Sequence, residues 1–200
     1  MGASGIKNVT LQPGDALVIV DVQKDFLPGG SLAVPHGDEV VPALNRYLAA
    51  FSARGLLIYA TRDWHPASHC SFKAQGGPWP VHCVAETLGA QFADNIKFYP
   101  GIAIISKATQ PDKDAYSGFE GTDLDARLRA QNIKRVFIGG LATDYCVLNT
   151  VRDALGHGYK VYLLSDAIRA VNVKPDDGHK SEEEMQRLGA IIITLNMLGA

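Results

Sequence analysis

The chain has 200 residues, of which 46% are hydrophobic and 20% charged, as is typical of one globular domain with a sizeable core. The net charge is −2 and charges of both signs are dispersed, so the sequence offers no basic stripe to nucleic acid or anionic lipid. No apolar run is long enough to span a membrane. We therefore expect a single domain over residues 1–200, and a small uncharged substrate is compatible with this charge balance.

Cysteine usage and the N-terminal residues bear on the compartment. Three cysteines, an odd number without a paired framework, fit a reducing compartment better than a disulfide scaffold. Residues 1–6 lack the basic and apolar regions of a secretory signal, and Ile6 departs from the myristoylation pattern. These features predict a cytoplasmic protein.

Apolar, β-branched runs alternate along the chain with segments of helical periodicity. In chain order, the sequence predicts a strand at 16–20, a helix at 38–54, strands at 56–61 and 102–106, a helix at 122–131, a strand at 135–138, a helix from 146 to about 156, a strand at 161–164, a helix at 181–188 and a strand at 191–194. Strands that are continuous apolar blocks are typical of parallel sheets. We expect an α/β fold with a mostly parallel central sheet of about six strands and helices on both faces.

Two segments show no periodicity. Residues 22–37 contain Pro28-Gly29-Gly30 and are expected to be irregular. Residues 64–100 are rich in proline, glycine, histidine and aromatic residues. A loop of that length in a compact domain usually carries function.

Asp21, Asp63, Lys107 and Cys146 each stand at the carboxyl end of a different expected strand. In parallel sheets the active crevice lies at that edge, so the four groups should face one rim. Cys146 begins the helix after its strand, where unpaired N–H groups and the helix dipole favour the thiolate. It is therefore a candidate nucleophile, and the alternative is a small buried hydrophobic residue.

A thiol that attacks an unreactive carbonyl needs a base, stabilisation of the oxyanion and help for the leaving group. Asp21 is the candidate base, and Lys107 the candidate group that lowers the thiol pKa. Because a carboxylate beside a thiol raises its pKa, the lysine and the helix terminus must offset that effect. A turn aspartate and a solvated strand-end lysine are the alternatives.

A second group of residues has the character of a metal site. Asp63 and His65 lie two apart, hence on one side of an extended chain, and a ligand from the following loop would complete an open three-ligand site. One rival is a closed structural zinc site of Cys70, Cys83 and two histidines, although their spacing departs from the Cys-x-x-Cys pattern. The other rival is that the histidines merely line the loop.

Three aromatic residues, Phe26, Trp79 and Tyr116, lie in loops beyond expected strands. They are candidates for the wall of a pocket that takes a flat ligand. Ordinary core packing explains aromatic residues about as well.

Several segments, in order over about residues 16–193, carry a resemblance to a known family. They are Asp-Val-Gln-Lys-Asp-Phe (21–26), Arg-Asp-Trp-His-Pro (62–66), Gly-Pro-Trp-Pro-Val-His-Cys (77–83), Lys-Ala-Thr (107–109) with Asp-Ala-Tyr-Ser-Gly-Phe (114–119), and Gly-Leu-Ala-Thr-Asp-Tyr-Cys-Val (140–147). Together they resemble the nicotinamidases of the isochorismatase-like cysteine hydrolases. The second and third segments are the ones most specific to nicotinamidases.

The resemblance implies that Asp21, Lys107 and Cys146 form a catalytic triad. In this family the peptide bond before the oxyanion-hole residue is cis, which falls at Leu141–Ala142. The backbone N–H groups of Ala142 and Cys146 would then bind the oxyanion.

The resemblance also implies a divalent metal ion held by Asp63, His65 and His82, usually zinc, with iron(II) or manganese(II) as alternatives. His69 has no firm counterpart in the family, so we expect it to be structural or to support the ligands. The substrate ring would lie among Phe26, Trp79 and Tyr116.

The implied activity is hydrolysis of nicotinamide to nicotinate and ammonia through a cysteine thioester, in NAD salvage, with pyrazinamide as a further candidate substrate. One rival is another amidohydrolase of the superfamily, acting on carbamoyl or ureido substrates, which would share the triad but not need the metal trio. From a different class, a non-enzymatic zinc-bearing or thiol redox module is the second rival. The metal's identity and the formation of a homo-oligomer stay open at this point.

Overall fold

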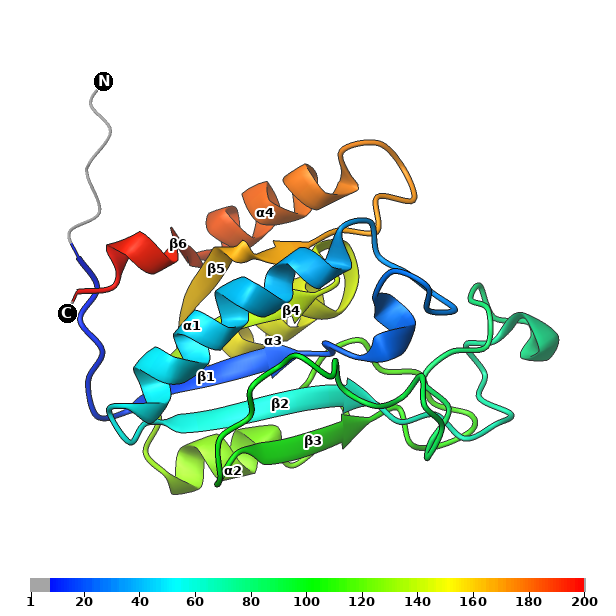
Figure 1. The fold of residues 1–200 in the computed structure, drawn as a ribbon, viewed down its shortest axis with the longest axis horizontal. Coiled ribbons are helices and arrows are strands. Elements are labelled where there is room, and N and C mark those ends of the chain that lie inside the picture. The colour runs from blue at the N-terminus through cyan, green and yellow to red at the C-terminus, as the bar shows by residue number, and fades with distance from the viewer. Residues whose placement is uncertain (1–7, 200) are drawn as a thin grey trace.

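Six strands lie side by side in one sheet at the centre of the computed structural model, which describes residues 8–199 (Figure 1). In sheet order they are β3 (Ala103–Lys107), β2 (Leu57–Asp63), β1 (Asp15–Val20), β4 (Arg135–Leu141), β5 (Lys160–Arg169) and β6 (Ile191–Ile193). All neighbouring strands of this sheet are parallel, as expected. The strand order reverses between β1 and β4, the place where such sheets bind ligands.

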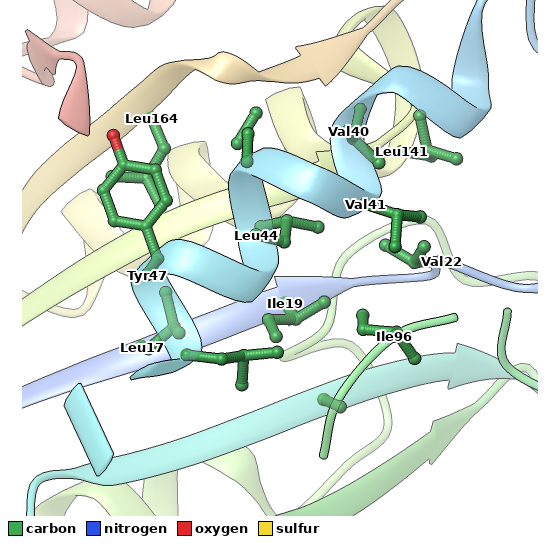
Figure 2. Packing of buried hydrophobic residues seen from close by; sticks show 14 of the residues in the cluster. Leu17, Ile19, Val22, Val40, Val41, Leu44, Tyr47, Ile96, Leu141 and Leu164 are labelled. Atoms are coloured by element: carbon green, nitrogen blue, oxygen red, sulfur yellow. The ribbon is translucent and has the colours of Figure 1, made fainter. Parts of the chain in front are cut away.

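The alternation of side chains along β1 supplies two separate cores. Leu17 and Ile19 pack on the face covered by α1 (Val40–Ser52), against residues such as Leu44 (Figure 2). Val18 belongs to the core on the opposite face, and Val20 with it. The expectation of helices on both faces is therefore confirmed.

Three helices cover the second face, namely α2 (Leu124–Ala130), α3 (Leu148–Gly156) and α4 (Asp177–Leu188). Each contributes buried apolar residues to that core: Leu128 from α2, Val151 from α3 and Met185 from α4. No helix within residues 8–199 has both the length and the apolar character required to cross a bilayer.

The predicted elements are all present, with shifted ends. α1 begins at Val40 after a 3-10 turn at Gly37–Glu39, and β5 continues past the expected Leu164 to Arg169. β5 continues because the backbone stays in the ladder, with a register shift, beyond its polar Ser165. The loop at 64–100 holds only a short 3-10 turn, Lys73–Gln75, within this part of the chain. Short 3-10 turns also occur at Lys24–Phe26 and Leu195–Met197.

Cys146 lies in a π-helical turn, Thr143–Val147, that precedes α3, rather than in the first turn of an α-helix as expected. The difference is small in space, because the turn leads directly into α3. π-helical turns are rare and are frequently found at functional sites. The expectation about a secretory signal concerns residues 1–6, which lie outside the described residues.

Gly140 allows the tips of β1 and β4 to approach each other closely. Its φ of 129° is a conformation that L side chains rarely adopt, and a Cβ there would lie 2.0 Å from the carbonyl oxygen of Val20. Val20 precedes Asp21, and Gly140 lies just before the turn that carries Cys146. A glycine is therefore required where the two strand ends meet.

Candidate active site

Four neighbouring strands of the sheet deliver the predicted reactive residues to one rim. Asp21 directly follows β1, Asp63 and Lys107 are the last residues of β2 and β3, and Cys146 lies in the turn after β4. Asp21 has a φ of 47°, and its N–H still bonds the carbonyl oxygen of Thr61 on β2. The expected convergence of these four side chains is confirmed by the distances between them.

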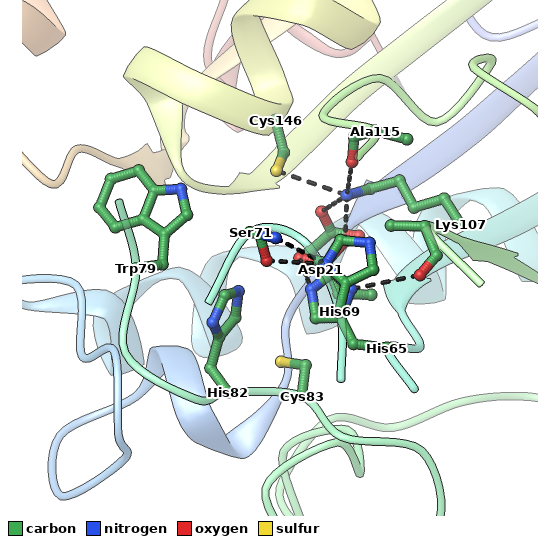
Figure 3. Close-up of polar contacts among 12 residues, drawn as sticks. Asp21, His65, His69, Ser71, Trp79, His82, Cys83, Lys107, Ala115 and Cys146 are labelled. Atoms are coloured by element: carbon green, nitrogen blue, oxygen red, sulfur yellow. Dashed lines mark hydrogen bonds and ion pairs between the residues drawn. The ribbon is translucent and has the colours of Figure 1, made fainter. Parts of the chain in front are cut away.

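The amine of Lys107 lies at the centre of this group (Figure 3). Its Nζ is 3.0 Å from Oδ2 of Asp21 and 3.5 Å from Sγ of Cys146, and it donates to the carbonyl oxygen of Ala115 at 3.0 Å. It also donates to Oδ1 of Asp63. The exposed fractions are 0% for Asp21, 1% for Lys107 and 6% for Cys146, so the ionic contacts are formed almost without water.

Burial decides the proton affinities of the base and the thiol. It raises the pKa of Asp21, although Lys107 opposes the shift. Burial also raises the pKa of the Cys146 thiol well above its usual range, and the lysine offsets this only in part while the neighbouring carboxylates add to it. The expected preference for a thiolate is therefore wrong for this site, because desolvation outweighs the position of the thiol in the chain. A thiol beside a strengthened base is the resting arrangement.

The lysine and the second carboxylate are both held in their charged forms. Burial alone would lower the pKa of Lys107, but the facing carboxylates of Asp21 and Asp63 raise it well above its usual range. Burial alone would raise the pKa of Asp63, but Lys107 and His65 hold it below its usual range. The site thus carries a fixed positive charge between two carboxyl groups.

Asp63, His65 and His82 offer one donor atom each, and these atoms all lie within 4.8 Å of one another. Nδ1–H of His65 is placed to donate to the carbonyl oxygen of Ala108 at 3.2 Å, and Nδ1–H of His82 to that of Pro80 at 2.8 Å. Both rings then turn Nε2 toward the shared space. Nε2 of His65 is buried with no hydrogen-bond partner, and it lies 3.7 Å from Oδ2 of Asp63.

An unpartnered buried nitrogen is costly unless something binds it. A carboxylate with two imidazoles is a donor set that suits zinc and leaves further coordination positions open. The described residues therefore fit a divalent metal ion at the expected place.

The loop cysteines take no part in this trio. Within residues 8–199, no group of side chains that could hold a metal includes Cys70 or Cys83, so the closed zinc site is not formed. His69 bonds Ser71 at 2.8 Å through Nδ1 and the carbonyl oxygen of Lys113 at 3.1 Å through Nε2. Its ring stacks on His65, with centroids 4.1 Å apart, which supports the ligand without adding one.

A pocket that is partly open to solvent joins the thiol to the metal trio. Phe26, Trp79 and Tyr116 all line it, as expected. Trp79 donates from Nε1 to the hydroxyl of Tyr116 at 2.9 Å, and its ring meets that of Tyr145 edge to face at 5.0 Å. Phe26 lies beside His82, with ring centroids 5.7 Å apart. The aromatic residues therefore bound the pocket, and Phe26 belongs at the same time to the core on the α1 face.

Sequence reasoning missed other residues of the pocket wall, which are Leu32, Val34, Ser71, Asp114, Ala115, Tyr145 and Val171. For Tyr145, its position next to Cys146 was an available signal. The remaining ones lie in loops, where no periodicity marks the side that faces a ligand. The peptide bond Leu141–Ala142 is cis, as the resemblance implied, and both Ala142 and Cys146 line the pocket.

Comparison with known proteins agrees with the fold and the site described above. The isochorismatase domain matches residues 15–197. The chain belongs to the isochorismatase family. Within this family, it is 40% identical over 204 residues to the nicotinamidase of Escherichia coli (strain K12), with 92% of this chain and 96% of that protein covered.

Solved structures of the isochorismatase-like fold agree closely with the chain. The pyrazinamidase of Pyrococcus horikoshii in complex with zinc is 52% identical, with a TM-score of 0.88 and coverage of 92% of this chain and 100% of the other. PnC1 from L. infantum in complex with nicotinate is 36% identical, with a TM-score of 0.90 and coverage of 96% and 99%. The fold expectation is thereby confirmed over nearly the whole length of the chain.

Proposed function

We propose that this isochorismatase-family chain is a nicotinamidase, which hydrolyses nicotinamide to nicotinate and ammonia as a step of NAD salvage. The observation that carries the proposal is one pocket that is lined both by the buried thiol of Cys146 and by the three residues that fit a metal ion. The amine of Lys107 lies 3.5 Å from that thiol and 3.0 Å from the carboxylate of Asp21. The Escherichia coli relative is a nicotinamidase, and the L. infantum structure holds nicotinate. Pyrazinamide is also a flat carboxamide with ring nitrogens, and it is the second candidate substrate for the same pocket.

In the first step Asp21 accepts the proton of the Cys146 thiol, and the sulfur attacks the carboxamide carbon. The raised pKa of Asp21 makes this carboxylate a stronger base than usual, which the high pKa of the thiol demands. Lys107, 3.5 Å from the sulfur, stabilises the negative charge as it forms. The backbone N–H groups of Ala142 and Cys146 receive the oxyanion.

In the second step the tetrahedral intermediate breaks its carbon–nitrogen bond. Asp21 returns its proton to the departing nitrogen, which leaves as ammonia, and a thioester to Cys146 remains. Water that is deprotonated by Asp21 then attacks the thioester carbonyl carbon, and nicotinate is released as the thiol regains its proton. Lys107 stays charged throughout, because its pKa lies well above its usual range.

Asp63, His65 and His82 would hold the metal ion, for which zinc is our first candidate and iron(II) or manganese(II) the alternatives. When bound, the metal would supply an anchor for the pyridine nitrogen and so position the substrate rather than activate its carbonyl group. The rings of Phe26 and Trp79 bound the space left for the substrate.

The same-superfamily rival, an amidohydrolase for carbamoyl or ureido substrates, leaves the metal trio unexplained. Such substrates have no ring nitrogen that a metal ion would need to anchor. The geometry of Asp63, His65 and His82 therefore favours an aromatic amide with a ring nitrogen. A cytoplasmic location and a homo-oligomer stay predictions.

The test is an ammonia-release assay on nicotinamide, before and after chelation, with metal analysis of the same sample. We expect ammonia and nicotinate in equal amounts, loss of turnover when the metal is removed and recovery when it is restored. Turnover of a ureido substrate but not of nicotinamide would overturn the substrate assignment. Full turnover by protein shown to be free of metal would overturn the role of the trio.

A further inference from the structure

Residues 23–26, which we call the 23–26 turn, follow the end of β1 and bond the segments that carry the metal trio. Phe26 reaches the pocket, whereas Gln23 and Asp25 are not among the residues that line it. The side chains of Gln23 and Asp25 instead bond the backbone at or beside the trio. The mechanism above assigns neither of them a role.

Gln23 is fully buried and bonds both backbone groups of Asp63. Its Oε1 accepts the N–H of Asp63 at 2.8 Å, and its Nε2 donates to the carbonyl oxygen of Asp63 at 2.8 Å. The same Nε2 also donates to the carbonyl oxygen of Ala90 at 2.9 Å. Both polar atoms of this carboxamide are thus bonded to backbone groups, with two of the three bonds to Asp63 and one to Ala90.

The position of Gln23 in the sheet explains why such a bond is needed. The ladder between β1 and β2 runs to the pair Ile19 and Ala60, and the chain leaves the strand direction at Asp21, whose φ is 47°. Beyond that point β1 offers no further backbone partner on this side to the last residue of β2. The carboxamide of Gln23 takes that place, so Asp63 stays in line with the sheet.

Asp25 has a corresponding role for the segment that carries His82. Its Oδ2 accepts the N–H of Cys83 at 2.7 Å, and Cys83 directly follows His82. The carbonyl oxygen of Cys83 in turn accepts the N–H of His65 at 3.0 Å. The carboxylate of Asp25 therefore fixes the backbone of Cys83, which directly follows His82 and bonds the backbone of His65.

The 23–26 turn is itself held tightly in place. The N–H of Asp25 bonds the carbonyl oxygen of Gly89 at 3.0 Å, and a Cβ at Gly89 would lie 2.1 Å from Oδ2 of Asp25. No side chain fits between the turn and this loop. The carboxylate of Asp25 is thereby kept in one position.

We propose that Gln23 and Asp25 are positioning residues that set the spacing of the three metal donors, Gln23 through Asp63 and Asp25 through the segment of His82. This inference rests on the proposed function, because it takes the trio to be a metal site. Groups that orient metal ligands from behind commonly change metal affinity by about 10- to 100-fold when they are removed. The two side chains should therefore control how tightly the ion is held rather than the chemistry at the thiol.

The test compares zinc affinity, measured by competition with a chromophoric chelator, among the unaltered chain, Gln23→Met and Asp25→Ala. We expect both variants to bind zinc about 10- to 100-fold more weakly. The visible spectrum of the cobalt(II)-loaded form should change as well, and lost turnover of nicotinamide should return at raised zinc concentration. A merely structural role would lower thermal stability without any such rescue.

Asn45 provides the matched control. Its carboxamide also bridges a backbone segment, accepting from the N–H of Lys97 at 2.7 Å and donating to the carbonyl oxygen of Asn95 at 2.9 Å, away from the pocket. Asn45→Leu should lower thermal stability and leave the zinc affinity unchanged.

The outcomes separate this inference from the proposed function. Zinc affinity and cobalt spectra equal to those of the unaltered chain in both variants would overturn it, and Asp25→Ala alone decides if Gln23→Met does not fold. An unaltered chain that binds zinc but does not hydrolyse nicotinamide would overturn the proposed function, while the affinity comparison would still decide the present inference. An unaltered chain that binds no divalent metal would overturn both.

Discussion

Lys107 donates a hydrogen bond from its buried amine to Oδ1 of Asp63, while the other carboxylate oxygen of Asp63 lies 3.7 Å from Nε2 of His65. The amine beside the thiol and the trio that fits a metal ion therefore share one carboxylate. Because both partners are buried, the loss of either leaves an unpaired charge that water cannot solvate. A substitution at Lys107 should therefore also alter the metal trio, and a substitution in the trio should alter the surroundings of the thiol.

Replacing Lys107 by Met should therefore affect both stability and turnover. Without the amine, the carboxyl groups of Asp21 and Asp63 face each other unpaired, and we expect the metal-depleted protein to lose about 3–5 kcal/mol of unfolding free energy. Urea unfolding measures this loss, and the ammonia assay should show no turnover. Lys24→Met is the control, because Lys24 pairs with the largely exposed Asp94 and its loss should change stability little. An unchanged unfolding midpoint for Lys107→Met would contradict the assigned ion pairs.

Replacing Cys146 by Ala tests the nucleophile separately from the metal. The sulfur is not part of the trio of Asp63, His65 and His82, so metal content should stay normal. Turnover of nicotinamide should fall below detection, because no other described thiol lines the pocket. Metal analysis and the ammonia assay on one sample provide both measurements. Retained turnover would remove Cys146 from its role.

The loop cysteines and His82 make a paired prediction about the metal. Replacing Cys70 and Cys83 together by Ser should leave the metal content near normal, because neither side chain belongs to a metal-binding group in residues 8–199. Replacing His82 by Ala should lower the metal content and raise the KM for nicotinamide. The assignment of His82 as a ligand would be wrong if His82→Ala kept full metal and an unchanged KM. Complete metal loss in the double cysteine variant would instead support the closed zinc site that includes Cys70 and Cys83.

Tyr47 gives a prediction about alkaline stability. Its hydroxyl donates to Oδ1 of Asp166 at 2.7 Å, and burial together with this carboxylate raises the pKa of Tyr47 above its ordinary 10.0. A raised pKa in the folded state means that the stabilisation is fully present below pH 10.0 and is lost as the pH rises beyond it. Tyr47→Phe should lower the unfolding free energy by about 1–3 kcal/mol at neutral pH.

The difference in unfolding free energy between the unaltered chain and Tyr47→Phe should then become smaller as the pH rises above 10.0. Urea unfolding at a series of pH values measures it. Tyr99→Phe serves as the control. Because Tyr99 is exposed, the loss of its hydroxyl should leave the dependence of the unfolding free energy on pH unchanged. A gap that widened with rising pH would contradict the direction of the Tyr47 shift.

Much of the fold was open to prediction because the strands are uninterrupted apolar runs. A strand such as β1, buried on both faces, is apolar without interruption from Ala16 to Val20, so its sequence alone marks it. Where polar residues enter a strand, the same reasoning stops early, as at Ser165 of β5. The convergence of the reactive residues was predictable for a related reason. Parallel strands bring their carboxyl ends together, and Asp21, Lys107 and Cys146 each lie at or after such an end.

What escaped prediction depends on three-dimensional surroundings. The position of Cys146 near a helix suggested a lowered thiol pKa, but the extent of its burial reverses the shift, and burial is not visible in a local pattern. Gln23 and Asp25 were visible only as part of a family motif. Their bonds to Asp63 and Cys83 join segments far apart in the chain, which no periodicity records.

The reacting groups and the ring-contacting groups come from different kinds of structure. Asp21, Lys107 and Cys146 are fixed by strand ends of one sheet, whereas Trp79 and Val171 reach the pocket from loops. Loops accept insertions and substitutions that a sheet does not. Substitutions in these loops alone would therefore change which amide substrate the pocket accepts. The residues that transfer the proton would stay unchanged, because the sheet holds them.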